Sequence, residues 1–278
     1  MPYALFFLIA IAVLDASAQV VTGSIQDKVT REELPYATIG IKGKAIGGIA
    51  NRTGEFTLDL SKASQRDSLI ARYLGYKPFA ICVADLAAAQ PLTIQLVPET
   101  RMLQEVLVYD KRALTTLGNN RKSFYHTGWG DNESERGRTR GLVIEKPEFP
   151  MLLVSFHMHI HENTFDSVRF RLQILGAAEP FRPLLTENIF VTTAKKKGWI
   201  EFDLKPYQIK ATERFVLAVE WVDAWGKPKG PDEFSHILTI SESRPGGKIY
   251  HREKPEEIIR LQDHTLLPSF YVKGIGVK

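Results

Sequence analysis

Cysteine is nearly absent from this chain. Cys82 is the single cysteine among 278 residues, so an internal disulfide cannot form and a disulfide-based scaffold is excluded. Its thiol lies in the alternating segment Phe79–Val83, which predicts a small buried strand residue and no reactive nucleophile. With 44% hydrophobic and 24% charged residues, the chain can instead fill one or two ordinary hydrophobic cores.

Long apolar runs are also scarce. The run Tyr3–Leu14 has about a dozen residues, fewer than the roughly 20 that a membrane-spanning helix needs. The small residues Ala16–Ala18 follow it, so we expect a signal peptide over residues 1–18 with cleavage before Gln19. No cysteine stands at that point, which excludes a lipoprotein anchor. We therefore expect a periplasmic, outer-membrane-associated or extracellular protein with no transmembrane anchor after cleavage.

The chain also lacks a concentrated region of one charge. Its 36 Lys and Arg residues and 32 Asp and Glu residues give a net charge of +4, and the two signs are interspersed. The one basic run, Lys195–Lys197, precedes a glycine and is typical of a solvated turn. Binding to nucleic acid requires a basic stripe that neutralises phosphates, so we do not expect nucleic acid as a partner.

Short segments rich in β-branched residues begin directly after the expected cleavage site. Turn residues separate them, notably in Asn51–Gly54. This spacing predicts a β-sandwich of about seven strands over residues 19–98. The expected strands are 20–25, 38–42, 55–60, 68–73, 77–83 and 92–97.

Four motifs in this region carry a resemblance to a known family. They are Val21–Asp27, Leu34–Ile39, Gly48–Phe56 and Tyr73–Tyr76, and in this order they resemble the carboxypeptidase regulatory-like domain. The resemblance implies a transthyretin-like sandwich that accompanies other domains and is not itself catalytic.

The next segment, Leu103–Val108, resembles the one that follows this module in large outer-membrane nutrient transporters of Bacteroidota-type bacteria. There, such a segment can pair with an energy-coupling protein by strand addition. The remaining residues lack the series of amphipathic strands that a transporter barrel needs. We therefore expect an edge strand and a linker over residues 99–138.

The C-terminal half, residues 139–278, also has strand patterns. Alternation in Val168–Ile174 and Trp199–Leu204 predicts half-buried antiparallel strands, and Phe215–Val222 is apolar on both faces, as in a central strand. We expect a jelly-roll-like β-sandwich, so that the whole protein is all-β. The segments Leu117–Asn119, Phe170–Leu172, Phe202–Leu204 and Glu220–Trp221 also resemble a group of envelope proteins that carry the same N-terminal module. That resemblance implies no particular activity.

Histidine occupies alternate positions in one segment of this half. His157, His159 and His161 would share one face of a strand, with neighbours about 6.5–7 Å apart, and such a pair can bind one zinc ion. His159 and Glu162 also have the HxxE spacing of zinc carboxypeptidases, which makes a zinc-dependent hydrolase one alternative.

The surroundings of these histidines favour a different interpretation. Phe156, Met158 and Ile160 alternate with them as core residues, which makes the histidines polar positions of a half-exposed strand. The next histidine is the distant His236, and no GxSxG nucleophile motif is present. We therefore expect no bound metal, no cofactor and no enzymatic activity.

Two binding functions remain. The first is an envelope protein that binds or assembles with another macromolecule through a polar sheet face. The second is a carbohydrate-binding protein that uses aromatic side chains, for which Trp129, Trp199 and Trp225 are candidates. The expected binding face comprises the three histidines with Arg169, Arg171, Trp199, Glu201 and Asp203.

Overall fold

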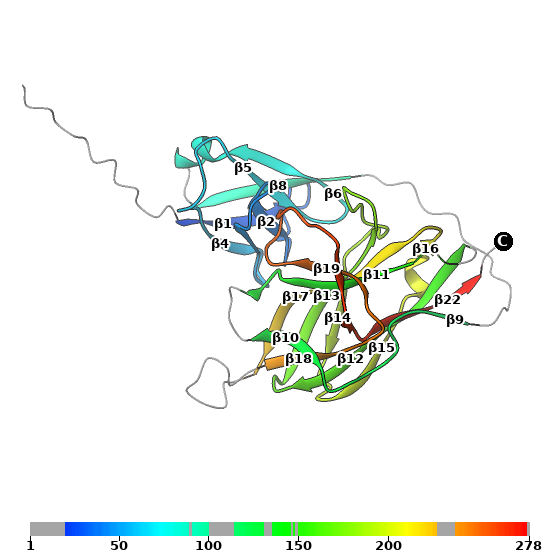
Figure 1. The fold of residues 1–278 in the computed structure, drawn as a ribbon. Helices are drawn as coiled ribbons and strands as arrows, with labels where there is room; N and C mark the ends of the chain where they lie inside the picture. The colour runs from blue at the N-terminus through cyan, green and yellow to red at the C-terminus, as the bar shows by residue number, and fades with distance from the viewer. Residues whose placement is uncertain are drawn as a thin grey trace, which may run out of the picture.

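The computed structural model describes residues 20–88, 91–99, 114–130, 135–145, 147, 150–226 and 237–276. The described chain forms two β-rich units, each with two sheets (Figure 1). The all-β prediction is therefore confirmed. The expected signal peptide and the segment 103–108 lie outside the described residues. None of the helices formed by the described residues is long and apolar enough to cross a membrane.

The N-terminal unit is a sandwich of two four-stranded sheets, with the orders β4-β1-β8-β6 and β3-β2-β5-β7. Strands β1 and β8 are parallel neighbours. The segment 77–83, expected as one strand, is divided by Pro78, which lacks the N–H that a continuous ladder needs. The bounds are β1 (Val20–Asp27), β2 (Thr38–Ile41), β3 (Gly47–Ile49), β4 (Glu55–Asp59), β5 (Ser68–Arg72), β6 (Tyr76–Lys77), β7 (Phe79–Cys82), the 3₁₀ helix η1 (Val83–Ala88) and β8 (Leu92–Pro98).

A separate hydrophobic core fills this unit. Along β4, Phe56 and Leu58 are buried while their neighbours are exposed, as strand alternation requires. The predicted chain reversal before β4 is present: the Asn51 side chain accepts hydrogen bonds from the backbone N–H groups of Thr53 and Glu55, and Gly54 adopts a φ of +75°. That backbone conformation favours glycine.

The C-terminal unit is a larger sandwich. One sheet has eight strands, with the path β10-β18-β12-β22-β9 and with β15, β16 and β21 beside it. The other has six, in the order β14-β13-β17-β11-β19-β20. The bounds are β9 (Thr115–Gly118), β10 (His126–Gly130), β11 (Thr139–Ile144), β12 (Met151–Asn163), β13 (Ser167–Gly176), β14 (Ile189–Thr193), β15 (Gly198–Asp203), η3 (Lys205–Tyr207), β16 (Lys210–Ala211), β17 (Phe215–Trp225), β18 (Ile237–Ser243), β19 (Gly247–Arg252), β20 (Gln262–His264), β21 (Leu267–Pro268) and β22 (Phe270–Gly276).

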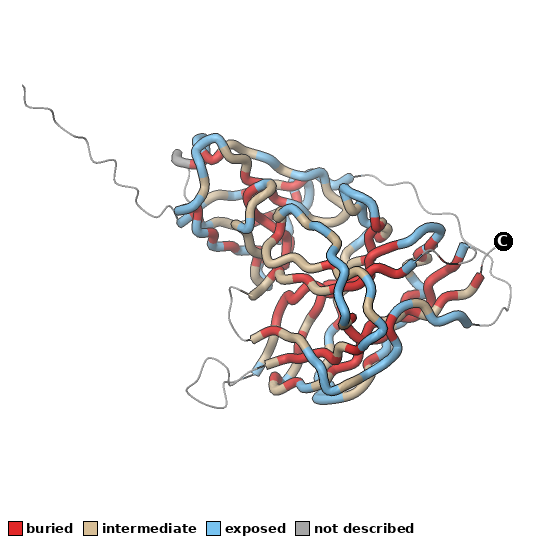
Figure 2. Tube along the Cα trace, in the orientation of Figure 1, coloured by how far each residue is buried: buried red, intermediate tan, exposed pale blue. Residues whose placement is uncertain are grey.

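The second core lies between these two sheets, and Figure 2 shows the buried strands that pass through the centre of the unit. Phe156, Met158 and Ile160 of β12 point into it, as alternation predicted. Strand β17 is buried on both faces because Leu217 and Val219 enter this core, whereas Val216 and Ala218 join a smaller apolar cluster with Tyr250 on the opposite face.

The expected linker over residues 99–138 is wrong in part, because it contains β9 and β10. Strand β10 pairs with β18, and a Cβ on Gly128 would lie 2.1 Å from the Leu238 carbonyl oxygen. The glycines that suggested a loop therefore permit close contact between strands.

The N-terminal unit covers the outer face of the six-stranded sheet. Tyr36 and Arg52 contact Asp223 of β17, and Arg72 pairs with Glu256, which follows β19. The eight-stranded sheet lies on the opposite side, at the bottom of Figure 1. The N-terminal unit thus packs against the outer face of the six-stranded sheet and not against that of the eight-stranded sheet.

Candidate functional site

The alternating histidines of β12 lie on the outer face of the eight-stranded sheet. Strand pairing places His157 between Glu201 of β15 and Tyr271 of β22. His159 lies opposite Trp199 of β15. Side chains directly opposite on adjacent strands are close enough to interact.

On this face, aromatic and imidazole rings from neighbouring strands contact one another. His157 stacks on Tyr271 with centroids 4.3 Å apart, and Tyr271 meets Trp199 edge to face at 5.0 Å. His159 meets Trp199 at 5.1 Å. A further stacked pair, at 4.5 Å, joins β10 to β12. We call this set the imidazole–aromatic strip; it comprises His126, His157, His159, His161, Trp199 and Tyr271.

Two of the three histidines on β12 are more buried than the sequence indicated. His157 and His159 are only 4% and 6% exposed, so the half-exposed position expected for them is wrong. Neighbouring rings cover them, and each has a serine partner: Ser155 Oγ lies 2.8 Å from His157 Nε2, and Ser241 Oγ lies 2.8 Å from His159 Nδ1.

The environment of these imidazoles disfavours their charged form. Burial lowers the pKa of His157, His159 and His161 below the ordinary value of 6.5. Nearby lysines and, for His161, His126 add to this effect. All three imidazoles therefore bind a proton less readily in the folded protein than a free imidazole does.

The described side chains do not form the zinc site considered from the sequence. Among the described residues, no group of three or more His, Cys, Asp or Glu side chains is arranged to hold a metal ion. His157 and His159 each use a ring nitrogen on a serine, and His161 stacks against His126. Glu162 follows an irregularity in the pairing of β12 with β18 and is exposed. His236 lies outside the described residues.

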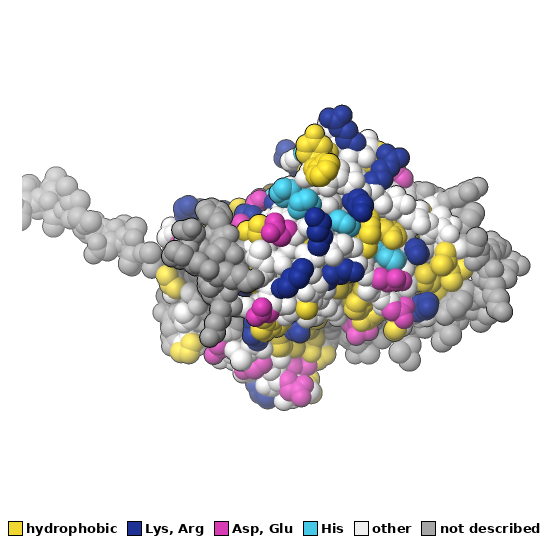
Figure 3. All heavy atoms as spheres, turned by 90° about the horizontal axis from the view of Figure 1, so that it is seen from below, with side chains coloured by type: hydrophobic (Ala, Val, Ile, Leu, Met, Phe, Trp, Pro, Cys, Tyr) yellow, Lys and Arg dark blue, Asp and Glu magenta, His cyan; other side chains and the backbone are white. Residues whose placement is uncertain are grey.

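Lysines surround the strip. Lys122, Lys195 and Lys197 are close enough to His159, and Lys273 to His157, to lower the pKa of the histidines. Figure 3 shows histidine side chains together with Lys and Arg on this side of the molecule. Glu201 and Asp203 are exposed on β15 at its margin. The rim of the strip therefore carries four lysines against three acidic side chains, Glu162, Glu201 and Asp203, which leaves a small excess of basic charge.

Exposed aromatic side chains continue the strip beyond β10. Phe124 is 94% exposed and Tyr125 is 55% exposed, and both directly precede His126. His126 Nδ1 lies 3.1 Å from the Phe124 carbonyl oxygen. Phe124 therefore adds an exposed aromatic side chain two positions before the end of the strip at His126.

The predicted binding face is divided by the structure. Glu201, Asp203 and Trp199 lie on the histidine side, but Arg169 and Arg171 belong to β13 of the other sheet. The alternation of β13 was read correctly, but the N-terminal unit covers that face. Arg169 lies over the rings of Tyr36 and Trp225. Arg171 is only 6% exposed and donates a hydrogen bond to the Tyr36 carbonyl.

Two buried carboxylates of β17 organise this junction between the units. Asp223 pairs with Arg52 at 2.5 Å and accepts a hydrogen bond from Tyr36 Oη at 3.1 Å. Glu220 lies 3.3 Å from Arg171 Nε. Sequence reasoning missed both, although an acidic residue in an otherwise apolar strand such as Phe215–Val222 signals a buried partner.

The three candidate tryptophans do not form one sugar platform. Trp129 is buried and stacks on Trp221 at 5.8 Å. Trp225 lies beneath Arg52 at the junction. Trp199 alone of the three belongs to the strip, and its ring partner Tyr271 was not identified from the sequence because β15 and β22 are joined only through β12.

Comparison with known families identifies the N-terminal unit. The family model described as "CarboxypepD_reg-like domain" matches residues 21–108. These residues are a CarboxypepD_reg-like domain. The resemblance carried by the four motifs is thereby confirmed, and the match extends past residue 98, where the sequence placed the end of the domain. The regulatory-like domain is the unit that covers Arg169 and Arg171.

The other comparisons add little. No curated protein matches the chain. Among solved structures, the chain is similar to one titled "Structure of infectious bursal disease virus Gx strain", with 7% identity and a TM-score of 0.25, covering 93% of this chain and 65% of that one. A TM-score of this size does not indicate a shared fold.

Proposed function

We propose that the protein is a non-enzymatic binding protein of the cell envelope that holds another envelope protein against the imidazole–aromatic strip. The observation that carries this proposal is the arrangement of the strip with its basic rim and the exposed Phe124, on the face opposite the regulatory-like domain. The envelope location rests on the expected signal peptide and on the proteins that carry this module.

The chemistry of the strip supports a docking role. Aromatic residues dominate the binding energy of protein interfaces, and a rim of charge steers a partner of opposite sign. Trp199 and Tyr271 are partly exposed and held edge to face, so they lose little side-chain freedom on binding. The basic rim favours a partner with an acidic surface.

The serine–histidine pairs of the strip are poorly placed for catalysis. A hydrolytic serine must reach a substrate carbonyl, but Ser155 is 6% exposed and Ser241 is fully buried. These hydroxyls instead satisfy imidazole nitrogens and fix the orientation of the rings. This favours binding over hydrolysis.

Charge reversal on the rim provides the test. After cross-linking in intact cells, a tagged Lys122→Glu/Lys197→Glu variant should capture at least tenfold less of the partner than the unaltered protein does. The matched control, Lys28→Glu/Lys77→Glu, changes two exposed lysines of the regulatory-like domain and should capture normally. Equal capture by both variants, or equal loss from both, contradicts the proposal.

A carbohydrate partner is the second candidate, favoured by one observation. The edge-to-face pair of Trp199 and Tyr271 beside lysines suits an acidic glycan, because aromatic rings pack on sugar C–H groups while lysines pair with its acid groups. The same capture experiment separates the two candidates: polysaccharide in the bound fraction, lost in the Lys122→Glu/Lys197→Glu variant, selects the glycan.

A further inference from the structure

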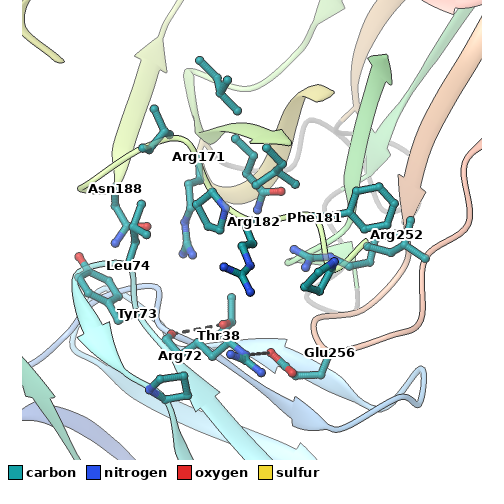
Figure 4. Close-up of a pocket in the computed structure, with 18 of the residues that line it drawn as sticks. Thr38, Arg72, Tyr73, Leu74, Arg171, Phe181, Arg182, Asn188, Arg252 and Glu256 are labelled. Carbon is teal, nitrogen blue, oxygen red and sulfur yellow. Dashed lines mark hydrogen bonds and ion pairs between the residues drawn. The ribbon is translucent and has the colours of Figure 1, made fainter. Parts of the chain in front are cut away.

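A cavity of about 660 Å³ lies between the two units, on the side away from the strip. The regulatory-like domain contributes Thr38 and the segment Arg72–Tyr76, and the C-terminal unit contributes β13, the loop 179–188 and β19 (Figure 4). Its volume is within the range of roughly 300–1,000 Å³ typical of small-molecule sites. Such sites commonly form where two domains meet.

Arginine side chains reach this cavity from four parts of the chain. Arg72, Arg171, Arg182 and Arg252 all line it, and Figure 4 shows Arg171 and Arg182 pointing into the space above Thr38. Arg252 approaches from the side of Phe181. Because a guanidinium presents a fork of N–H donors, several of them around one space suit an oxyanion.

Carboxylates behind the arginines hold three of these groups in place. Glu220, fully buried, lies 3.3 Å from Arg171 Nε and 3.1 Å from Arg252 Nη2. Glu256 pairs with Arg72 at 2.6 Å. The guanidinium groups are therefore oriented before a ligand arrives, which reduces the entropy lost on binding.

Arg182 differs from the other three. It is exposed, and no hydrogen bond or ion pair holds its side chain among the residues that the structure describes. Four carboxylates line the cavity. Glu256 is engaged by Arg72, and Glu257 accepts hydrogen bonds from the backbone N–H groups of Glu253 and Lys254. Among the described residues, neither Glu99 nor Glu179 forms an ion pair with Arg182. Arg182 therefore remains available to a ligand.

The rest of the lining suits the ring of a sugar. Tyr73 and Phe181 provide aromatic surface, and Phe181 is fixed edge to face against the buried Tyr250 at 5.6 Å. The buried Gln173 Oε1 has no hydrogen-bond donor among the described residues. An acceptor of this kind is satisfied by a ligand hydroxyl.

We propose that this cavity binds a small hydroxylated oxyanion, a sugar that carries a carboxylate or a phosphate. Arg182 and Arg171 pair with the acid group, the aromatic side chains pack on the C–H face of the ring, and Gln173 accepts from a hydroxyl. The cavity and the strip lie on opposite sheets, so this site does not rest on the proposed function.

Calorimetric titration of the full chain with glucuronate, glucose 6-phosphate and glucose tests the proposal. We expect at least one anionic sugar to bind, and glucose to bind at least tenfold more weakly. Arg171 is buried and its replacement threatens folding, so the informative variant is Arg182→Gln, which should weaken binding of the anionic sugar at least tenfold. Arg66→Gln, an exposed arginine outside the cavity, is the matched control.

Each outcome of the titration is decisive. Glucuronate binding alone assigns a sugar acid, and glucose 6-phosphate binding alone assigns a sugar phosphate. Absence of binding by both anionic sugars at millimolar concentration, equal binding of glucose, or equal effects of Arg182→Gln and Arg66→Gln overturns the proposal.

Discussion

At the scale of single residues, the most consequential side chain of the junction is Glu220. It is fully buried, and its two oxygens face Arg171 and Arg252. Removing a carboxylate from water is costly, and the two guanidinium groups offset that cost. If the carboxylate were lost, both arginines would remain in the interior without the counter-charge that they share.

Glu220→Gln tests this dependence. We expect the free energy of unfolding to fall by about 3–5 kcal/mol, the usual effect of removing one partner from a buried ion pair. Urea denaturation of the full chain measures it. Glu145→Gln changes an exposed carboxylate and should alter stability by less than about 0.5 kcal/mol. A decrease in the free energy of unfolding of less than about 1 kcal/mol for Glu220→Gln would show that the buried arginines do not need the Glu220 carboxylate as a counter-charge.

The histidines of the strip give stability a defined dependence on pH. Burial lowers the pKa of His157, His159 and His161 in the folded protein, so below pH 6.5 the unfolded chain binds more protons than the folded one. The contribution of the neutral histidines to the free energy of unfolding is therefore complete above pH 6.5. It is lost as the pH falls through the pKa values that these histidines have in the folded protein.

A His157→Gln/His159→Gln variant isolates this effect. Between pH 7.5 and pH 5, its free energy of unfolding should fall less steeply than that of the unaltered protein, whatever the absolute stabilities of the two. Urea denaturation at a series of pH values gives both slopes. Parallel slopes would mean that the two imidazoles titrate in the folded protein as they do in the unfolded chain.

At the scale of elements, β10 depends on glycine at one position and not at another. A Cβ on Gly128 would lie 2.1 Å from the Leu238 carbonyl oxygen of β18. No described atom lies within 4 Å of a Cβ on Gly130, in the same strand. Because β10 carries His126, its pairing with β18 also positions one end of the strip.

Gly128→Ala should therefore lower the free energy of unfolding by about 1–3 kcal/mol, the typical cost of overpacking. Gly130→Ala is the matched variant and should change it by less than about 0.5 kcal/mol. Thermal unfolding of the two variants side by side measures the difference. Equal midpoints would indicate that β10 can move away from β18 at little cost.

The sequence predicted most strands but only part of the site. Alternation correctly assigned Phe156 to the core and His157 to the opposite face, because that pattern depends on one strand alone. The burial of His157 depends on Tyr271, which is more than 100 positions away in the chain and reaches it through strand pairing. No local pattern reports a neighbour of that kind.

At the scale of the whole molecule, the two outer faces of the C-terminal sandwich have different surroundings. The six-stranded sheet is covered by the regulatory-like domain, which is why Arg169 and Arg171 could not be placed from the alternation of β13. The eight-stranded sheet carries the strip, its basic rim and the exposed Phe124. Our account assigns partner binding to this second face.

Site-specific photo-cross-linking in intact cells tests that assignment most directly. A photoreactive residue at Phe124, 94% exposed beside the strip, is compared with one at Val29, 74% exposed on the regulatory-like domain. We expect a discrete adduct from position 124, abolished by Lys122→Glu/Lys197→Glu, and none from position 29. An adduct from position 29 alone, or none from position 124, would contradict the assignment of the strip as the binding face.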